Sequence, residues 1–173
     1  MWRGRKLKVA DDHVRPTPDR ARVTLFNWLL ADLPGTRVLD LFAGTGVLGF
    51  EALSRGAVHA TFVDHNPTAC ALLACHRDML GASASINRAD ARQWLAQRSS
   101  GERWDIVFLD PPFDSPLLAE TVSAVAGRLT PGGAVYVESD ETFHLSAAAQ
   151  SAGLTVASSS RAGAVRYALL RTP

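Results

Sequence analysis

The sequence predicts an α/β fold in which a mostly parallel sheet of seven strands carries helices on both faces and ends in an antiparallel hairpin. Short β-like runs alternate with helical patterns along the chain, as expected when helices cross over between parallel strands. The run 105–110 is apolar between two aspartates, which is typical of a central strand buried on both faces. The runs 154–159 and 165–170 lie only a few residues apart, with Gly163 between them, so we expect them to pair as a hairpin at the sheet edge.

The first helix is expected to begin at Thr17-Pro18, with Thr17 as N-cap and proline at the first helical position, and to end before Pro34-Gly35. Its apolar residues recur at spacings of three and four and predict one buried face: Val23, Phe26, Leu30 and Leu33.

The remaining elements follow from apolar runs and from turn residues. The strands are expected at 37–42, 60–64, 83–87, 105–110, 134–138, 154–159 and 165–170. The other helices are expected at 46–55, 67–80, 90–94, 116–128 and 141–152. Asn66-Pro67 is a strong helix start, and Pro131-Gly132-Gly133 predicts a turn before the fifth strand.

Length and composition indicate one globular domain. The chain has 173 residues, of which 47% are hydrophobic and 20% charged, so disorder throughout is not expected. No run approaches the ~18 apolar residues of a membrane span. The basic start, Met1 to Lys8, has no apolar stretch behind it and does not resemble a secretory signal. Cys70 and Cys75 lie within one helical pattern, which argues against a disulfide framework and fits a cytoplasmic protein.

Positive charge is concentrated at the start of the chain. The net charge is +1, but residues 1–22 hold seven Arg and Lys against three Asp, a local charge of +4. We therefore expect a basic N-terminal arm at 1–16 and a single folded domain at 17–173. Such an arm suits a polyanion and is equally consistent with a solvated terminus.

A glycine-rich turn is the first informative motif. The segment Asp40 to Gly49 follows a strand, opens a helix and contains the spacing G-x-G-x-x-G at Gly44, Gly46 and Gly49. Such glycines permit a tight turn and let a ligand approach the helix N-terminus. They also permit close packing of strand and helix without any ligand. The residues expected to bind a cofactor are Asp40, Phe42, Ala43, Gly44, Gly46, Asp64 and Asp90.

Asp64, twenty residues after Gly44, is placed for two ribose hydroxyls. Three details favour S-adenosylmethionine over NAD. Asp40, in the first strand, suits a methionine ammonium and opposes a phosphate. Asp90 is placed for an adenine amino group, with a plain helix cap as the alternative. The third detail is the strand-four motif, which belongs to methyl transfer rather than hydride transfer.

The segment Asp110-Pro111-Pro112-Phe113 ends the buried fourth strand, and ligands bind beyond the carboxyl ends of such strands. The prolines fix the backbone and leave carbonyls pointing outward. The Asp110 side chain and a proline carbonyl then offer two acceptors to an exocyclic amine, while Phe113 stacks on its ring. These four residues are the expected catalytic set. A rigid turn is the alternative reading of the motif taken alone.

Other chemistries fit less well. A cysteine nucleophile would have to lie near this loop, and both cysteines are remote in sequence. Cys70, Cys75 and His76 lie on one helix without a second ligand pair, so we expect a buried structural role and no metal site.

These motifs resemble the class I, Rossmann-fold, S-adenosylmethionine-dependent amino-methyltransferases. The segments 15–20 (Arg-Pro-Thr-Pro-Asp-Arg), 24–29 (Thr-Leu-Phe-Asn-Trp-Leu), 2–7 and 136–138 are similar to the RsmD-type 16S rRNA guanine-N2 methyltransferases. The resemblance covers nearly the whole chain. The family usually has a few more residues ahead of Trp2, which form an opening strand.

The resemblance implies methylation of a guanine N2 in 16S rRNA, presented in the small ribosomal subunit or its assembly intermediate. Ribosomal proteins are further expected partners, and a monomer is expected. The arginines around the first helix start suit phosphate contacts. The residues expected to bind RNA are Arg3, Arg5, Lys6, Lys8, Arg15, Thr17 and Arg20, with Arg166 and Tyr167 as weaker candidates.

Three alternatives remain open. An adenine-N6 methyltransferase would use the same motif chemistry on DNA or RNA, although 173 residues leave no room for a separate target-recognition domain. A non-catalytic RNA-binding assembly factor could retain the fold without turnover. A dehydrogenase would bind NAD instead.

Overall fold

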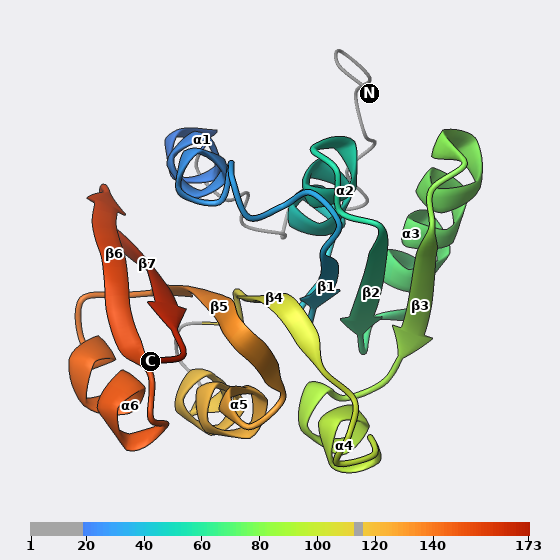
Figure 1. Cartoon of the computed structure of the whole chain (residues 1–173). Helices are drawn as coiled ribbons and strands as arrows, with labels where there is room; N and C mark the ends of the chain where they lie inside the picture. Colours follow the sequence, from blue (N-terminus) through green and yellow to red (C-terminus); the bar gives the residue numbers. More distant parts are fainter. Residues whose placement is uncertain (1–18, 113–115) are drawn as a thin grey trace.

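One seven-stranded sheet organises the molecule, with the strand order β3-β2-β1-β4-β5-β7-β6 (Figure 1). The computed structural model describes residues 19–112 and 116–173. The strands are β1 (Arg37–Asp40), β2 (His59–Asp64), β3 (Ala84–Arg88), β4 (Trp104–Leu109), β5 (Leu129–Ser139), β6 (Thr155–Ala162) and β7 (Val165–Arg171). Strands β1 to β5 pair in parallel, and β7 is antiparallel to both β5 and β6. The predicted mostly parallel sheet with a terminal hairpin is confirmed.

Helices cover both faces of this sheet. They are α1 (Asp19–Trp28), α2 (Val47–Ser54), α3 (Pro67–Leu80), α4 (Ala91–Ala96), α5 (Leu117–Ala126) and α6 (Leu145–Ser151). Helices α1, α2 and α3 lie on one face, and α4, α5 and α6 lie on the other (Figure 1). Each layer encloses its own apolar cluster, because alternate residues of the buried strands point to opposite faces. None of the helices in the described ranges is both long and apolar enough to cross a membrane.

The buried face of α1 differs from the predicted one. Phe26 and Leu33 are fully buried as expected, but Val23 and Leu30 are 56% and 62% exposed. The helix instead buries Ala21, Leu25 and Phe26 against the sheet, and Leu29 is buried in the turn that follows it. The segment is apolar on more than one side, so helical spacing alone did not select the side that the sheet covers. The expected N-cap, Thr17, lies outside the described residues.

Two segments predicted as turn or helix have another structure. The predicted turn 131–133 is part of β5, where the register shifts: Trp104 pairs with Leu129, but Ile106 pairs with Ala134. The last helix, expected from 141, begins only at Leu145. The Asp140 carboxylate accepts the amides of Thr142 and Phe143 and holds this stretch in a side-chain-capped turn. Helix α1 ends at Trp28, five residues before its predicted end, and residues 29–32 form turns instead. The remaining element bounds agree with the predictions to within a few residues.

The hairpin lies at the sheet edge, as the sequence predicts. Gly163 has φ +61° at the first position of the two-residue connection between Ala162 and Val165. Glycine suits this position because two-residue hairpin turns need a positive φ there. Strand β6 is one of the two edge strands, and none of its residues is buried.

The order in which strands are added to the sheet changes side at β1, so that β1 and β4 flank a topological switch point. Strands β2 and β3 are added on one side of β1, and β4 and β5 on the other. The loops after β1 and β4 therefore leave the sheet side by side, and the Leu41 amide donates to the Phe108 carbonyl at 3.2 Å. Ligand sites of open α/β sheets lie at such a switch point.

Candidate active site

The glycine turn links the end of β1 to the start of α2. Gly44 and Gly46 have φ of +50° and +76°, which L side chains rarely adopt. The Gly46 amide donates to Ala43 O at 2.7 Å, and the Ala43 amide donates to Val63 O at 3.0 Å. A Cβ on Gly46 would lie 2.4 Å from Leu73 Cδ2. The turn thus needs glycine both for its backbone and for the packing of α3 behind it.

Asp64 at the end of β2 is hydrogen bonded to the same turn. One carboxylate oxygen, Oδ2, accepts the Gly44 amide at 2.8 Å, and Oδ1 accepts the Asn66 amide at 2.8 Å. Its side chain is 11% exposed. A carboxylate oxygen has two lone pairs, so each oxygen retains acceptor capacity for a ligand hydroxyl.

Asp40 lies behind the turn rather than at its surface. Its side chain is buried, and Oδ2 accepts the Gly49 amide at 3.1 Å. Burial, together with the nearby Asp64 charge, raises the pKa of Asp40 to about 7, although the Gly49 hydrogen bond opposes the shift. Asp40 therefore changes charge near neutral pH and anchors the start of α2.

Asp90 is the N-cap of α4. Its Oδ1 accepts the amides of Arg92 and Gln93 at 3.0 and 3.1 Å. Asp90 is therefore a helix cap, which was the alternative role that the sequence left open. The preceding residue, Ala89, donates its amide to Asp64 O at 3.0 Å, so the β3–α4 loop is joined to the end of β2. Asp90 consequently lies near the same edge of the sheet as Asp64.

The other residues expected at the cofactor have mainly apolar surroundings. Ala43 is buried, and Phe42 is half-buried against the apolar cluster on the α4–α6 side. Their backbones form the first part of the turn.

The second predicted motif follows β4. Asp110 is half-buried, Pro111 is buried and Pro112 is exposed. The negative charge of Asp110 contributes to raising the pKa of Tyr136 on the neighbouring strand β5. Phe113 lies outside the described residues.

A buried polar pair on β5, Tyr136 and Glu138, was not among the predicted site residues. The Tyr136 hydroxyl donates to Glu138 Oε1 at 2.8 Å, and both side chains are buried. Burial and the adjacent Glu138 carboxylate raise the pKa of Tyr136, so its hydroxyl stays a proton donor across physiological pH. Phe108 and Tyr136 are in register on β4 and β5, so Asp110 and Glu138 occupy equivalent positions two residues further on. The sequence signal that could have found Glu138 is its position two residues after Tyr136, which matches the position of Asp110 two residues after Phe108.

Four carboxylates thus lie on one face of the sheet at neighbouring strand ends. Asp40 is in register with Phe62 and Phe108, and Asp64, Asp110 and Glu138 each follow at an even spacing on β2, β4 and β5. Residues two apart point to the same face, so all four belong to the α1–α3 side.

Of the residues predicted to bind RNA, three belong to the described part of the chain: Arg20, Arg166 and Tyr167. Arg20 lies exposed in the first turn of α1, and Arg166 is exposed on β7. Tyr167 is buried, so the expectation that it contacts RNA is wrong. Those outside the described residues are Arg3, Arg5, Lys6, Lys8, Arg15 and Thr17.

The described residues contain no cluster of three or more side chains suited to hold a metal ion. Cys70 is half-buried, with its thiol donating to Asp64 O at 3.4 Å, and His76 is buried against Phe50. Cys75 is exposed, so the expectation of a buried role is wrong for that residue. It lies on the outward side of α3.

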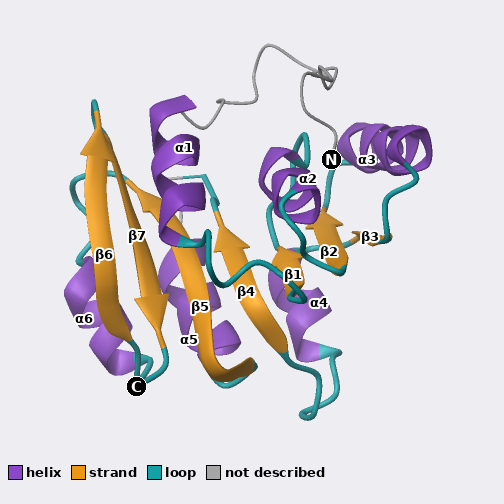
Figure 2. Cartoon of the chain, turned by 45° about the horizontal axis from the view of Figure 1, so that its top comes forward, coloured by secondary structure: helices purple, strands orange, loops and turns teal. Residues whose placement is uncertain are grey.

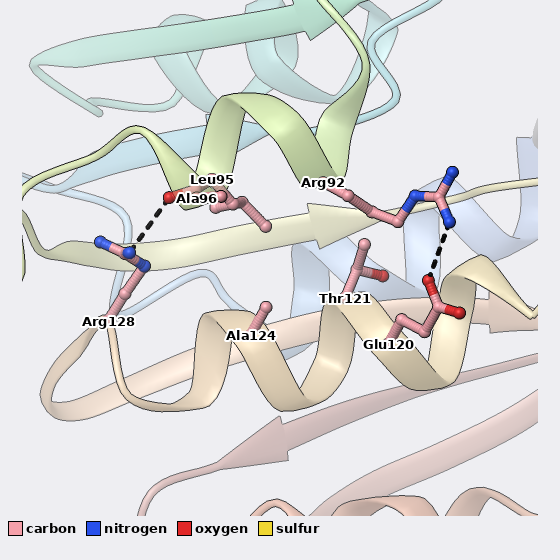
Figure 3. A pocket seen from close by; sticks show the side chains of 7 residues that line it. All are labelled: Arg92, Leu95, Ala96, Glu120, Thr121, Ala124 and Arg128. Carbon is pink, nitrogen blue, oxygen red and sulfur yellow. Dashed lines mark hydrogen bonds and ion pairs between the residues drawn. The ribbon is translucent and has the colours of Figure 1, made fainter.

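A hollow of about 370 Å³ lies between α4 and α5, on the sheet face opposite α1 to α3 (Figure 3). Arg92 forms an ion pair with Glu120 at one end, and the Arg128 guanidinium donates to Leu95 O at the other. It is lined by Arg92, Leu95, Ala96, Glu120, Thr121, Ala124 and Arg128. None of these was predicted as a site residue, and their contacts join the two helices.

The fold and the site at the β1–β4 switch point define a class I S-adenosylmethionine-dependent methyltransferase. A family model described as "Conserved hypothetical protein 95" matches residues 1–171. The chain is 43% identical over 144 residues to "Ribosomal RNA small subunit methyltransferase D" of Escherichia coli K12, covering 81% of this chain and 72% of that protein. It is 39% identical over 147 residues to the protein of the same name in Haemophilus influenzae, covering 82% and 76%.

Solved structures agree with these relatives. A putative methyltransferase from Escherichia coli, yhhF, superimposes with a TM-score of 0.86 at 38% identity, covering 99% of this chain and 93% of that one. A putative methylase from Haemophilus influenzae gives 0.84 at 34% identity, covering 99% and 94%. The chain therefore belongs to the family of the small-subunit rRNA methyltransferase D proteins.

Proposed function

We propose that this chain transfers a methyl group from S-adenosylmethionine to the exocyclic N2 of a guanine in 16S rRNA. The observation that carries the proposal is the contact between the two motif loops, where the Leu41 amide donates to Phe108 O. It brings the glycine turn beside the Asp110-Pro111-Pro112 segment. The relatives named for small-subunit rRNA methylation support the substrate.

The donor and acceptor set fits the cofactor. Asp40, Asp64 and Asp90 put three carboxyl groups around the turn, which disfavours the phosphates of a dinucleotide and favours hydroxyls and a cationic ligand. We assign Asp64 to the ribose hydroxyls and Asp90 to the adenine amino group. Gly44 and Gly46 open the backbone, and Asp40 offers negative charge toward the cationic methionine end.

The cofactor supplies, when bound, an electrophilic methyl group on a sulfonium, so that a C–S bond is exchanged for a C–N bond and the guanine nitrogen loses a proton. Asp110 and the Pro111 carbonyl accept the two hydrogens of the amine and hold its nitrogen in position. Phe113 stacks on the base. The prolines keep these acceptors fixed, and such positioning can lower a barrier by several kcal/mol. The departing proton goes to Asp110 or to water.

RNA must present the base outside its stack, because the amine of a paired guanine is not accessible to a pocket. We assign the positive residues of the basic arm and Arg20 to the RNA backbone. We further propose that the protein works as a monomer in the cytoplasm, on a small subunit or an assembly intermediate in which ribosomal proteins shape the target.

The test is methyl transfer from labelled S-adenosylmethionine to small subunits that lack base methylation, followed by nucleoside analysis. The wild-type protein is expected to label N2-methylguanosine, and Asp110→Ala is expected to lose this label while still binding the cofactor. Asp78→Ala, an exposed residue on α3, is the matched control. Label in N6-methyladenosine would overturn the substrate, and cofactor binding without any label would indicate a non-catalytic factor.

A further inference from the structure

Two arginines face one another near the tip of the β6–β7 hairpin. Arg161 on β6 is directly opposite Arg166 on β7, and both side chains are exposed. Directly opposite residues of an antiparallel pair have Cβ atoms about 4.5–5.5 Å apart, and like charges there destabilise the sheet. The hairpin itself therefore gains nothing from this pair.

Within residues 19–112 and 116–173, neither guanidinium has an ion pair or a side-chain hydrogen bond. Asp140 follows Ser139, the partner of Arg166 on β5, but its carboxylate accepts from the Thr142 hydroxyl and from the amides of Thr142 and Phe143 and forms no ion pair with either arginine. The two positive charges are thus available to a ligand.

The two arginines lie at the carboxyl ends of the parallel strands, which is also where the candidate active site lies. Arg166 pairs with Ser139 at the carboxyl end of β5, and the hairpin tip lies on the side toward which β4 and β5 point (Figure 2). Asp110 follows the neighbouring strand β4. Arg166 is two strand spacings from β4 and Arg161 is three, roughly 10 and 14 Å. Both side chains project on the α4–α6 face, because Arg166 alternates with Tyr167 of the α1–α3 cluster and Arg161 is opposite Arg166. They therefore lie near the strand ends beside Asp110 but on the other face of the sheet, where an RNA strand continuing from the target nucleotide can cross the sheet end.

A third arginine, Arg20, has no ion pair within the described residues. It lies exposed in the first turn of α1, which packs against β6 on the other face of the sheet from Arg161 and Arg166. Asp32, which follows α1, forms an ion pair with Arg171 at the end of β7 that is far from the hairpin tip. Helix α1 therefore begins toward the edge that carries the hairpin tip.

We propose that Arg161 and Arg166 bind phosphates of the RNA strand beside the target nucleotide. The proposal rests on the proposed function and extends its RNA surface from the basic arm to the far side of the active-site edge. Arginine suits this role because its fork of donors can bind phosphate oxygens in a bidentate manner. The bound phosphates also relieve the repulsion between the two side chains.

The test compares Arg161→Gln/Arg166→Gln with the control Arg37→Gln/Arg77→Gln, which removes the same charge. Arg37 begins β1, at the amino ends of the parallel strands, and Arg77 is in the last turn of α3. Binding of protein-free 16S rRNA is measured at several KCl concentrations. Loss of two phosphate contacts should reduce the slope of log K against log salt by about 1.4–1.8 and weaken binding at 0.1 M salt by roughly 20-fold or more. The control slope should equal that of the wild type.

Stability separates binding from a structural role. Arg161→Gln/Arg166→Gln should unfold at the same temperature as the wild type or at a higher one, with unchanged S-adenosylmethionine affinity. Arg166→Glu should raise the unfolding temperature further, through an ion pair with Arg161, and should weaken RNA binding more strongly. Arg161→Lys/Arg166→Lys should keep most of the salt slope. A wild-type slope in both the glutamine and the glutamate variants would overturn the proposal.

Two other outcomes are distinguishable. Unchanged binding of protein-free RNA together with weaker binding of whole subunits would assign the pair to a ribosomal protein and overturn the RNA contact. If the wild type labels no N2-methylguanosine but the variants still lose salt slope, the proposed function fails while the phosphate contacts stand.

Discussion

The carboxylate of Asp64 accepts the Gly44 amide at 2.8 Å and so joins the end of β2 to the glycine turn that follows β1. The other carboxylate oxygen accepts the Asn66 amide at the start of α3. One side chain therefore sets the relative positions of two loops that the chain separates by twenty residues. Any ligand hydroxyl bound by Asp64 would be held against the turn by the same group.

Replacing Asp64 with alanine is expected to weaken S-adenosylmethionine binding by at least roughly tenfold, because hydrogen bonds to a charged acceptor contribute about 1.5–3 kcal/mol each. Asp64→Asn keeps one acceptor oxygen and should lose less. Isothermal titration calorimetry measures both affinities. Asp78→Ala serves as control, since that carboxylate pairs only with Arg77 on the exposed surface of α3. Equal affinities for Asp64→Ala and the control would exclude Asp64 from the cofactor site.

Asp40 should make the protein less stable as pH rises. Its pKa is about 7 in the folded protein and 3.8 for the free side chain, so between pH 4 and 7 the folded state binds more protons than the unfolded state. Unfolding free energy then falls with pH through this range, by at most about 4 kcal/mol at 1.36 kcal/mol per pH unit, and levels off above pH 7. Urea unfolding should show a flatter profile for Asp40→Asn, whose side-chain oxygen can still accept the Gly49 amide. An identical slope in the variant would contradict the assignment.

The same titration should couple cofactor binding to proton release. A cationic ligand near the Asp40 carboxyl favours its ionised form, so binding at pH 7 is expected to release up to about half a proton. Calorimetry in buffers of different ionisation enthalpy measures the number released. Asp40→Asn should release none. Proton release that persists in the variant would have to come from another group.

Gly49 should not tolerate a methyl group, although it lies in a helix where alanine is intrinsically favoured. An added Cβ would lie 2.3 Å from Phe62 Cε1, and that ring is fully buried against Phe50. Gly49→Ala is expected to destabilise the fold by about 1–3 kcal/mol through overpacking. Gly127→Ala is the control, because nothing lies within 4 Å of its added Cβ. Adding Phe62→Leu should restore part of the loss, as measured by urea unfolding.

Local sequence patterns predicted the elements of this fold well because strands β1, β2 and β4 are short apolar runs with turn residues at their ends. The glycine turn was predictable for the same reason, since Gly44 and Gly46 require a positive φ that few other residues adopt. Both signals are contained within a few consecutive residues.

Features that depend on distant neighbours were not predictable in this way. Helix α1 and the turn after it are apolar at Val23 and Leu30 as well as at Leu25 and Leu29, and only the position of the sheet decides which pair is buried. Likewise, Glu138 carries no local signal beyond ending an apolar strand. Its proximity to the site follows from the register of β5 on β4.

The Tyr136–Glu138 pair should contribute to stability in a way that the cycle Tyr136→Phe, Glu138→Gln and their combination can measure. Tyr136→Phe removes the hydroxyl that donates to a buried carboxylate and is expected to destabilise the protein by about 1–3 kcal/mol. Tyr167→Phe, a buried tyrosine on the neighbouring strand β7, should lose less. Because the pKa of Tyr136 is raised, the cost of Tyr136→Phe should be constant from pH 6 to 9. Glutamine keeps an oxygen that can accept the Tyr136 hydroxyl, so if the two single losses simply add in the double variant, the charge of Glu138 adds nothing to the 2.8 Å hydrogen bond.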